Sequence, residues 1–285
     1  MKVKEIKQLL SQTDNPALLF NKLLLFKYAE QISKDQEIKK KDYIESFLES
    51  LRGKGVLKQS KLKGISKESF KLKTAYRLVI GAGYPSFVEN GFLFHHIYGI
   101  PYIPGETLKG LARFVFMLSI EESLKEEVKL SKLEEDLSEE KGIDAVPQKI
   151  KILFDDYEIE NPVGTFLKIF GSKKRRGQII FFDAYPVSFN PSRDFEIDIM
   201  NPHYGEYYQQ NKAPADWLNP TPIHFLALRE GIEFEFSLGT APLEPLREEE
   251  ESILLETAKR LLEIGLKNFG VGSKKLKGYG WFLDG

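Results

Sequence analysis

A proline-glycine turn joins an extended apolar segment to a helix near the middle of the 285-residue chain. After Gly105, apolar residues recur at helical spacing over about residues 108–120, so the sequence predicts a strand-turn-helix junction. Thr107 stands where an N-cap hydroxyl is expected, and Lys109 and Arg113 share one helical face. Free backbone N–H groups beside two cations can receive a phosphate, although an ordinary helix start with a solvated lysine has the same pattern.

A second glycine-rich segment, which we call the glycine-rich loop, lies near the C-terminus over residues 269–282. It follows a helix-like stretch at 248–267 and precedes a short apolar strand at 279–283, which reverses the strand-loop-helix order of dinucleotide-binding loops. Such a loop can cradle a sugar-phosphate chain, but a glycine-rich turn with solvated lysines has the same composition. The residues predicted to contact the chain of phosphates are Gly270, Gly272, Lys274, Lys275, Lys277, Gly278, Tyr279 and Gly280.

Two further stretches are candidates for contact with a polyanion. One is the basic run, which lies between two glycines and consists of Lys173, Lys174, Arg175 and Arg176. Four consecutive cations repel one another, which favours either binding to a polyanion or a solvated loop tip. The other is the segment 187–222, rich in Pro, Asn and Tyr, which we expect to be a long ordered loop. Its side chains around His203 and Tyr204 either stack on unpaired bases or pack the loop onto the body.

The charges of the chain are unevenly distributed, although the formal net charge is only −1. Residues 1–77 contain 18 Lys and Arg against 9 Asp and Glu, whereas residues 121–140 contain nine acids and three lysines. Clustered cations supply the sequence-independent attraction that binds a phosphate backbone. A Lys- and Glu-rich surface of the thermophile type also explains most of these charges, so net charge neither favours nor excludes nucleic acid.

Composition excludes several classes of site. Cysteine is absent, which excludes disulfides, thiolate catalysis and cysteine-ligated metals. The four histidines are His95, His96, His203 and His224. None has metal-ligand spacing, and adjacent histidines in a strand point to opposite faces, so we expect no metal and no cofactor. The N-terminus lacks a signal-peptide layout and no apolar stretch is long enough to span a bilayer, so we expect a soluble, cytoplasmic protein.

The order of the expected elements indicates an α+β fold. Strands are expected at 76–80, 178–185, 223–228 and 232–238, with helices at 16–30, 42–51, 108–120 and 252–267. From residue 71 to 285 this order fits a ferredoxin-like (RRM-like) βαββαβ core with large insertions around 121–165 and 187–222. Residues 1–70 are expected to form a helical, basic N-terminal extension, and the charged stretch 121–140 to be a solvated helix extension or insertion.

Four segments together resemble the RAMP superfamily of CRISPR-associated proteins. They are the stretch IPGETLKG at 103–110, the glycine-rich loop with its Gly-Tyr-Gly ending, the stretch 169–186 around the basic run, and the stretch 198–223. The last two look like the sixth subunit of the Cmr complex, the type III-B effector. The resemblance covers roughly residues 75–285, and Glu106 stands where the family often has serine, so this chain has no hydroxyl at that position to contact a phosphate.

The resemblance implies a noncatalytic, RNA-binding architectural subunit near the 3′ end of the guide RNA in an antiviral effector complex. Its partners would be guide RNA, target RNA, neighbouring RAMP subunits and the small helical subunit, with no membrane. In the resembled family a different subunit cleaves the target with an aspartate on a flexible loop, and neither Asp155, Asp156 nor Asp183 matches that context. A stand-alone endoribonuclease for CRISPR transcripts, with a histidine as acid or base, and a protein-only assembly scaffold are the alternatives.

Overall fold

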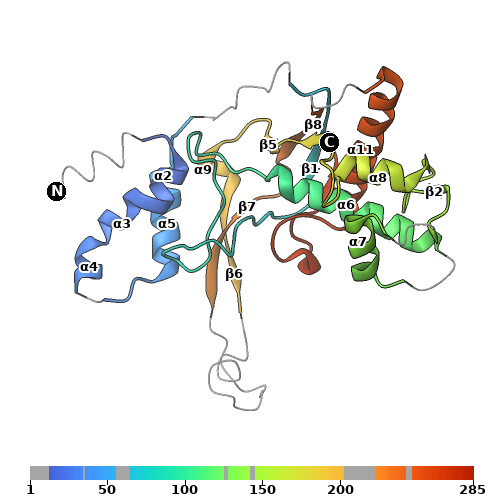
Figure 1. Cartoon of the computed structure of the whole chain (residues 1–285). Helices are drawn as coiled ribbons and strands as arrows, with labels where there is room; N and C mark the ends of the chain where they lie inside the picture. Colours follow the sequence, from blue (N-terminus) through green and yellow to red (C-terminus); the bar gives the residue numbers. More distant parts are fainter. Residues whose placement is uncertain are drawn as a thin grey trace, which may run out of the picture. The chain divides into compact units, whose positions relative to one another are not determined.

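The computed structural model describes residues 13–34, 36–55, 65–124, 128–141, 145–201, 222–241 and 246–285. The chain forms two compact units (Figure 1). Unit 1 comprises Met1–Gln59, Arg77–Pro101 and Ser188–Ile232, and unit 2 comprises Ser60–Tyr76, Tyr102–Val187 and Glu233–Gly285. The predicted domain boundary at residue 70 falls within a strand of unit 2.

Unit 2 combines helices with an antiparallel sheet, as the predicted α+β class requires. In chain order its elements are β1 (Glu68–Thr74), α6 (Gly105–Ser123), α7 (Leu130–Glu139), β2 (Lys149–Lys151), β3 (Glu158–Glu160), α8 (Pro162–Phe170), β4 (Ile179–Phe181), β5 (Tyr185–Pro186), β8 (Glu233–Thr240), α11 (Glu248–Asn268), the 3-10 turn η3 (Lys275–Lys277) and β9 (Phe282–Asp284). The main sheet has the order β4-β8-β1-β9, and β5 also pairs with β8. Every pair in it is antiparallel.

The alternating sequence of β8 explains why this sheet forms. Phe234 and Phe236 are fully buried, whereas Glu235 between them is half-exposed. On β1, Phe70 lies opposite Phe236 with stacked rings 5.2 Å apart, and Lys71 lies opposite Glu235. Aromatic pairs on one face and opposite charges on the other stabilise the pairing. The strand predicted at 232–238 is therefore confirmed.

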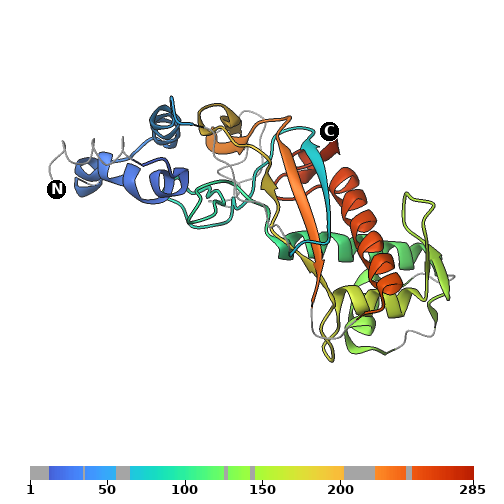
Figure 2. The ribbon, with the colours of Figure 1, turned by 90° about the horizontal axis from the view of Figure 1, so that it is seen from above.

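Helices α6 and α11 pack against each other and against the sheet. They approach closely at Gly265, where a Cβ would lie 2.6 Å from Leu111 Cγ. Figure 2 shows α11 running alongside β1 and β8. Helix α7 packs on α6 and buries Leu133 and Leu137. The charged stretch 121–140 was predicted to be a solvated helix extension or insertion, and this part of it is a separate, packed helix and not a solvated extension.

Two strand predictions need correction. The strand expected at 76–80 is wrong, because β1 ends at Thr74 and only Leu78 in the expected stretch forms an isolated bridge. The alternating lysines of β1 give it a polar composition, which hid its apolar face. The strand expected at 178–185 is divided into β4 and β5, and Ala184 between them bridges to Ile103.

Unit 1 contains a two-stranded antiparallel sheet of β6 (Phe195–Met200) and β7 (Ile223–Leu228), visible as a ribbon in Figure 1. Its helices are α2 (Pro16–Leu18), the π-helical turn η1 (Leu19–Leu23), α3 (Leu24–Lys27), α4 (Ala29–Ser33), α5 (Lys40–Ser50) and α9 (Pro191–Asp194). The strand predicted at 223–228 thus exists but pairs outside the main sheet. The segment 187–222, predicted to be a long loop, contains α9 and β6.

The core of unit 1 is an aromatic cluster around Phe195. Its ring lies within 5.7 Å, centroid to centroid, of the rings of Phe47, Phe92, Phe94 and Phe189. All four contacts are edge-to-face, one of the geometries that aromatic pairs prefer. Helix α5 packs against both strands of the sheet. No helix within the described ranges is long and apolar enough to cross a membrane.

Candidate nucleic-acid interface

The start of α6 is held against the sheet by its first residue. Gly105 is buried, and a Cβ there would lie 2.1 Å from the backbone oxygen of Phe181, so a larger residue would force the backbone apart. The backbone N–H of Gly105 donates a hydrogen bond of 2.7 Å to Asp183 Oδ1. This carboxylate occupies the donor, so one of the backbone N–H groups expected to be free at this junction is not available to a phosphate. Asp183 therefore has a structural role at the start of α6.

Thr107 does not cap α6. The N-cap residue is Pro104, which is extended and makes no side-chain cap bond. Thr107 lies within the first turn, where its backbone N–H donates to the Pro104 carbonyl at 3.0 Å and its side chain is exposed. The predicted cap is wrong because the first turn carries polar residues, so the apolar spacing placed the helix start too late.

Lys109 and Arg113 differ in their contacts. Arg113 donates to Glu134 Oε1 at 2.6 Å and to Ser138 Oγ at 3.2 Å, and its guanidinium lies 5.3 Å from the ring centroid of Phe166. Lys109 is half-buried, and burial, followed by the charge of Arg113, lowers its pKa. Within the described ranges the Lys109 side chain makes no ion pair. Lys109 is therefore the cation of this pair that is available to an external anion.

The basic run lies at the tip of a tight turn between α8 and β4. Gly171 and Arg176 close the turn as an isolated antiparallel bridge. Ser172 Oγ accepts hydrogen bonds from the backbone N–H groups of Lys174 at 3.0 Å and Arg175 at 3.2 Å. The run is thus an ordered turn with a fixed backbone.

Two of the four cations in the basic run are paired with the end of α7. Arg175 binds Glu140 through two hydrogen bonds of 3.0 and 2.7 Å, the strong geometry for guanidinium and carboxylate. Lys173 Nζ lies 3.0 Å from Glu139 Oε1. The other two cations, Lys174 and Arg176, are exposed and make no ion pair among the residues that the structure describes.

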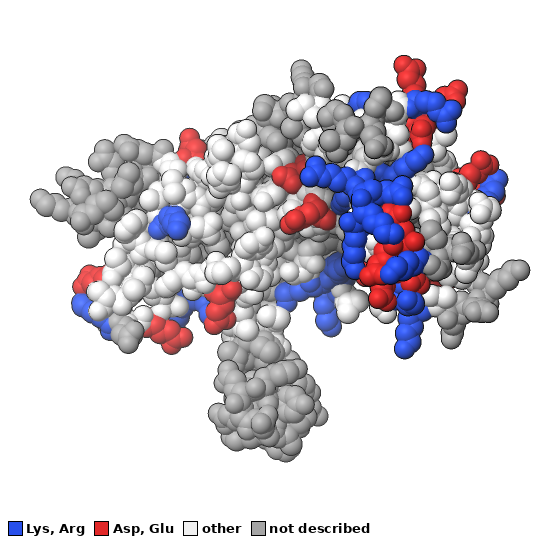
Figure 3. Space-filling model, viewed as in Figure 1, with Lys and Arg blue, Asp and Glu red and all other residues white. Residues whose placement is uncertain are grey.

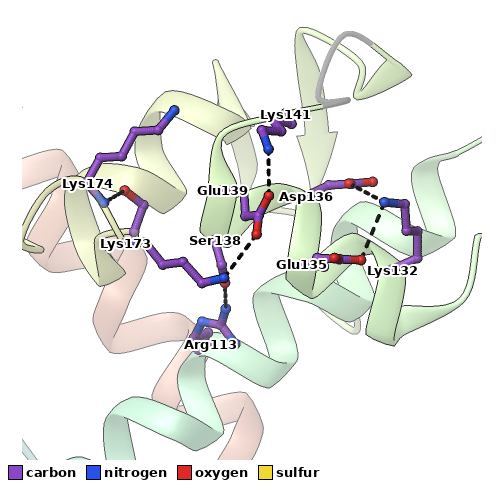
Figure 4. A network of polar contacts seen from close by, with 10 residues as sticks. Arg113, Lys132, Glu135, Asp136, Ser138, Glu139, Lys141, Lys173 and Lys174 are labelled. Carbon is purple, nitrogen blue, oxygen red and sulfur yellow. Dashed lines mark hydrogen bonds and ion pairs between the residues drawn. The ribbon is translucent and has the colours of Figure 1, made fainter.

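The acids of α7 neutralise much of the surrounding positive charge. Hydrogen bonds from Lys141 and then Lys173 lower the pKa of Glu139 to about 2 (Figure 4). On the face shown in Figure 3, Lys and Arg side chains gather over α6, α7 and α8, with acidic side chains among them. The sequence signal for this pairing was the acidic stretch 121–140, but its spatial partner could not be assigned without the fold.

The glycine-rich loop is a closed turn. Gly270 has φ of 68°, and a Cβ there would lie 2.6 Å from Trp281 Cδ1, while Gly278 has φ of 87°. Val271 N–H donates to the carbonyl of Gly280 at 2.9 Å, which joins the two ends of the loop. Gly272 and Gly280 also have positive φ angles, of 82° and 71°.

The lysines of this loop lie around the 3-10 turn η3. Lys275 and Lys277 are exposed and make no ion pair within the described part of the chain, and Lys274 is half-buried with φ of 62°. Trp281 Nε1 donates to the Lys275 carbonyl at 3.2 Å and so helps to fix the turn. Tyr279 is buried with its ring edge-to-face against Tyr76 at 5.2 Å, which makes it a support of the loop.

Packing between α6 and α11 brings the two glycine-bearing segments into one body. Phe269, which begins the glycine-rich loop, packs edge-to-face on Phe114 of α6 with ring centroids 5.3 Å apart. The loop therefore starts beside the part of α6 that carries Phe114. Of the other candidates, His203 and Tyr204 lie outside the described residues.

The two adjacent histidines lie in a turn of unit 1, not in a strand. The rings of His95 and His96 stack with centroids 5.1 Å apart, so the prediction that they point to opposite faces of a strand is wrong. His95 Nδ1 accepts backbone N–H bonds from Ile97 and Tyr98 at 3.3 and 3.2 Å. No group of three or more His, Asp or Glu side chains in the described ranges could hold a metal ion.

Comparisons with known proteins match the region that contains both the start of α6 and the glycine-rich loop. The model of the RAMP superfamily matches residues 71–283. The chain is 32% identical over 236 residues to CRISPR system Cmr subunit Cmr6 from Pyrococcus furiosus, a match that covers 75% of this chain and 67% of that protein. The crystal structure of Cmr6 from Pyrococcus furiosus is similar with a TM-score of 0.51 at 30% identity, over 79% of this chain and all of that one.

A chain of the type III-B Cmr-beta complex bound to cognate target RNA gives a weaker likeness. Its TM-score is 0.46 at 22% identity, over 85% of this chain and 63% of that one, which is too distant to carry a conclusion about function. The family model, in contrast, spans both glycine-bearing segments and most of unit 2. The chain belongs to the RAMP superfamily.

Proposed function

We propose that this chain is an RNA-binding subunit of a type III-B CRISPR (Cmr) effector complex in antiviral defence. The relationship to Cmr6 supports membership in such a complex. The observation that carries RNA binding is the tip of the glycine-rich loop, where Lys275 and Lys277 are exposed and make no ion pair within the described ranges. Both lysines project from a turn whose backbone is already fixed, so little freedom is lost on binding.

The proposed contact is with phosphates and not with base edges. Lys275 and Lys277 would neutralise phosphates, and Lys109, on α6 of the same unit, would add a third cation. Such contacts position an RNA strand without reading its sequence. That property suits a subunit that must hold many different guide RNAs.

We also propose that the main sheet of unit 2 belongs to a ferredoxin-like core. The element order β1-α6-β4-β8-α11-β9 and the antiparallel strand order β4-β8-β1-β9 support this assignment. In the complex, the chain would lie near the 3′ end of the guide RNA, beside neighbouring RAMP subunits and the small helical subunit.

The chain is proposed to have no catalytic step of its own. His95, one candidate for acid-base chemistry, uses Nδ1 to accept two backbone hydrogen bonds, which indicates a role in fixing its turn. Incubation of the purified chain with labelled repeat RNA in the absence of metal tests this part. Cleavage that is lost on substitution of one histidine would favour the endoribonuclease instead.

A salt titration of RNA binding tests the phosphate contact. For the double variant K275A/K277A, we expect weaker binding and a slope of log K against log salt that is smaller by about 1.4, since each phosphate contact on a single strand contributes about 0.7. The matched control is K149A/K151A, which removes two exposed lysines at the same spacing that are ion-paired on β2. Equal slopes for wild type and K275A/K277A would contradict the proposal.

A further inference from the structure

Three aromatic rings form a stacked cluster in a turn of unit 1. The rings of His95 and Tyr98 have centroids 4.5 Å apart and an interplanar angle of 25°, and those of His95 and His96 lie 5.1 Å apart at 14°. We call these three residues the ring cluster. His96 and Tyr98 are exposed, Tyr98 by 44% of its surface, and His95 is half-exposed. The cluster therefore presents ring surface to solvent instead of filling the core of the unit.

The backbone beneath the ring cluster is fixed by hydrogen bonds. His95 Nδ1 accepts from the N–H groups of Ile97 and Tyr98, and the Gly99 N–H donates to the His95 carbonyl at 2.7 Å. Asn15 Nδ2 donates to the Ile97 carbonyl at 2.9 Å, which ties the turn to the N-terminal helices of the same unit. The rings are thus held in place before any ligand arrives, which lowers the entropy cost of binding.

The chemistry of the ring cluster fits a nucleobase. Every base has a flat π-face, and stacking on His, Tyr, Phe or Trp is the usual way in which unpaired RNA bases are held. The rings of His96 and Tyr98 also have polar edges, which suits the polar rim of a base. The turn from residue 95 to 98 contains no lysine or arginine, so its contribution would come from stacking and not from phosphate neutralisation.

We propose that the ring cluster is a second RNA contact, a platform on which one unpaired nucleobase stacks. This inference rests on the proposed RNA-binding function, but it concerns a different unit and a different part of the RNA from the lysines of the glycine-rich loop. Binding there tolerates any base sequence. Its loss lowers affinity by a similar factor at every salt concentration, because no cation is removed.

Photocrosslinking and binding by the full-length chain test this proposal. The probe is a single-stranded RNA of mixed sequence containing 5-iodouridine, which crosslinks to aromatic side chains in contact with the base. We expect an adduct on the peptide that carries Tyr98, and for H96A/Y98A a loss of affinity of roughly 5- to 100-fold with an unchanged salt slope. The ring-retaining variant H96F/Y98F is expected to bind like wild type.

Ile97 supplies the matched control, since it is exposed by 64% in the same turn but carries no ring. I97A is expected to change affinity by less than about twofold. Far-UV circular dichroism of each variant checks that the substitutions in this turn have not unfolded the chain. The variant H96F/Y98F separates the loss of the rings from a local rearrangement of the turn.

The possible results separate this inference from the proposed function. If H96A/Y98A binds normally and no adduct forms at Tyr98 while K275A/K277A loses affinity, the ring cluster is not a base platform and the proposed function stands. If wild type neither binds nor crosslinks the probe at low salt, both ideas are wrong. If H96A/Y98A retains RNA but loses a protein subunit from the assembled complex, the cluster is a protein contact and the inference is overturned.

Discussion

The two glycine-bearing segments look alike in sequence but use their residues differently. At the start of α6, Gly105 is buried against Phe181 and its N–H is bound to Asp183. Its lack of a side chain therefore allows close packing, and its backbone donor is used inside the protein. In the glycine-rich loop, the glycines close a turn on the surface. There Lys275 and Lys277 remain exposed and make no ion pair within the described ranges.

The difference shows that a motif of glycine and lysine does not by itself define a phosphate site. Whether such a motif can bind phosphate depends on whether its hydrogen-bond donors and cations already have partners inside the protein. By this criterion the glycine-rich loop is the stronger candidate, and the start of α6 contributes Lys109 alone. The basic run lies between these cases, because α7 pairs two of its four cations.

The largest expected effect is on stability at the start of α6. The change Gly105→Ala would place a Cβ 2.1 Å from the Phe181 backbone oxygen, so we expect the free energy of unfolding to fall by about 1–3 kcal/mol. Urea denaturation measures it. The control is Gly110→Ala, where nothing lies within 4 Å and the helix should gain up to about 1 kcal/mol. Equal stability of the two variants would remove the contrast between the segments.

A smaller effect is expected from the acid that caps this helix. Asp183→Ala removes the acceptor of the Gly105 N–H, and loss of a helix cap costs about 1 kcal/mol of unfolding free energy. Asp183→Asn keeps an oxygen acceptor and should retain much of that stability. If both variants unfolded at the wild-type temperature, the N–H of Gly105 would be available to a ligand. The contrast between the start of α6 and the glycine-rich loop would then be wrong.

The smallest effect concerns the ion pairs of α7. The pKa of Glu139 is about 2 in the folded chain against an ordinary 4.5, so its ion pairs stabilise the fold above about pH 4.5 and lose this effect as pH falls toward 2. The stability difference between wild type and Glu139→Gln should therefore shrink over that interval, as followed by urea midpoints. A difference that stays constant with pH would show that Glu139 is not paired in solution.

Much of the fold could be predicted from local patterns. The alternation in β8 and the helical spacing of α11 gave these elements with nearly correct ends, because one face of each is continuously apolar. The first strand was placed at 76–80, just after β1, because Lys71 and Lys73 hide the alternation of β1. β7 was assigned to the wrong sheet because strand partners depend on tertiary contacts that a single segment does not encode.

The candidate site was less accessible to sequence reasoning. The sequence supplied the exposed lysines of the glycine-rich loop, but it could not show that Asp183 occupies the Gly105 N–H or that Glu139 and Glu140 pair with the basic run. Each of these partners lies more than 30 residues away in the chain. The stacking of His95 on Tyr98 was missed because a strand was assumed where the chain turns.

Crosslinking from the tip of the glycine-rich loop tests the central claim most directly. Leu276 is fully exposed between Lys275 and Lys277, so p-azidophenylalanine at this position in the assembled complex would report what the tip touches. We predict an adduct with the guide RNA, and none from the same probe at Ile253, an exposed position on α11. An adduct with protein alone, or no adduct from position 276, would contradict the account.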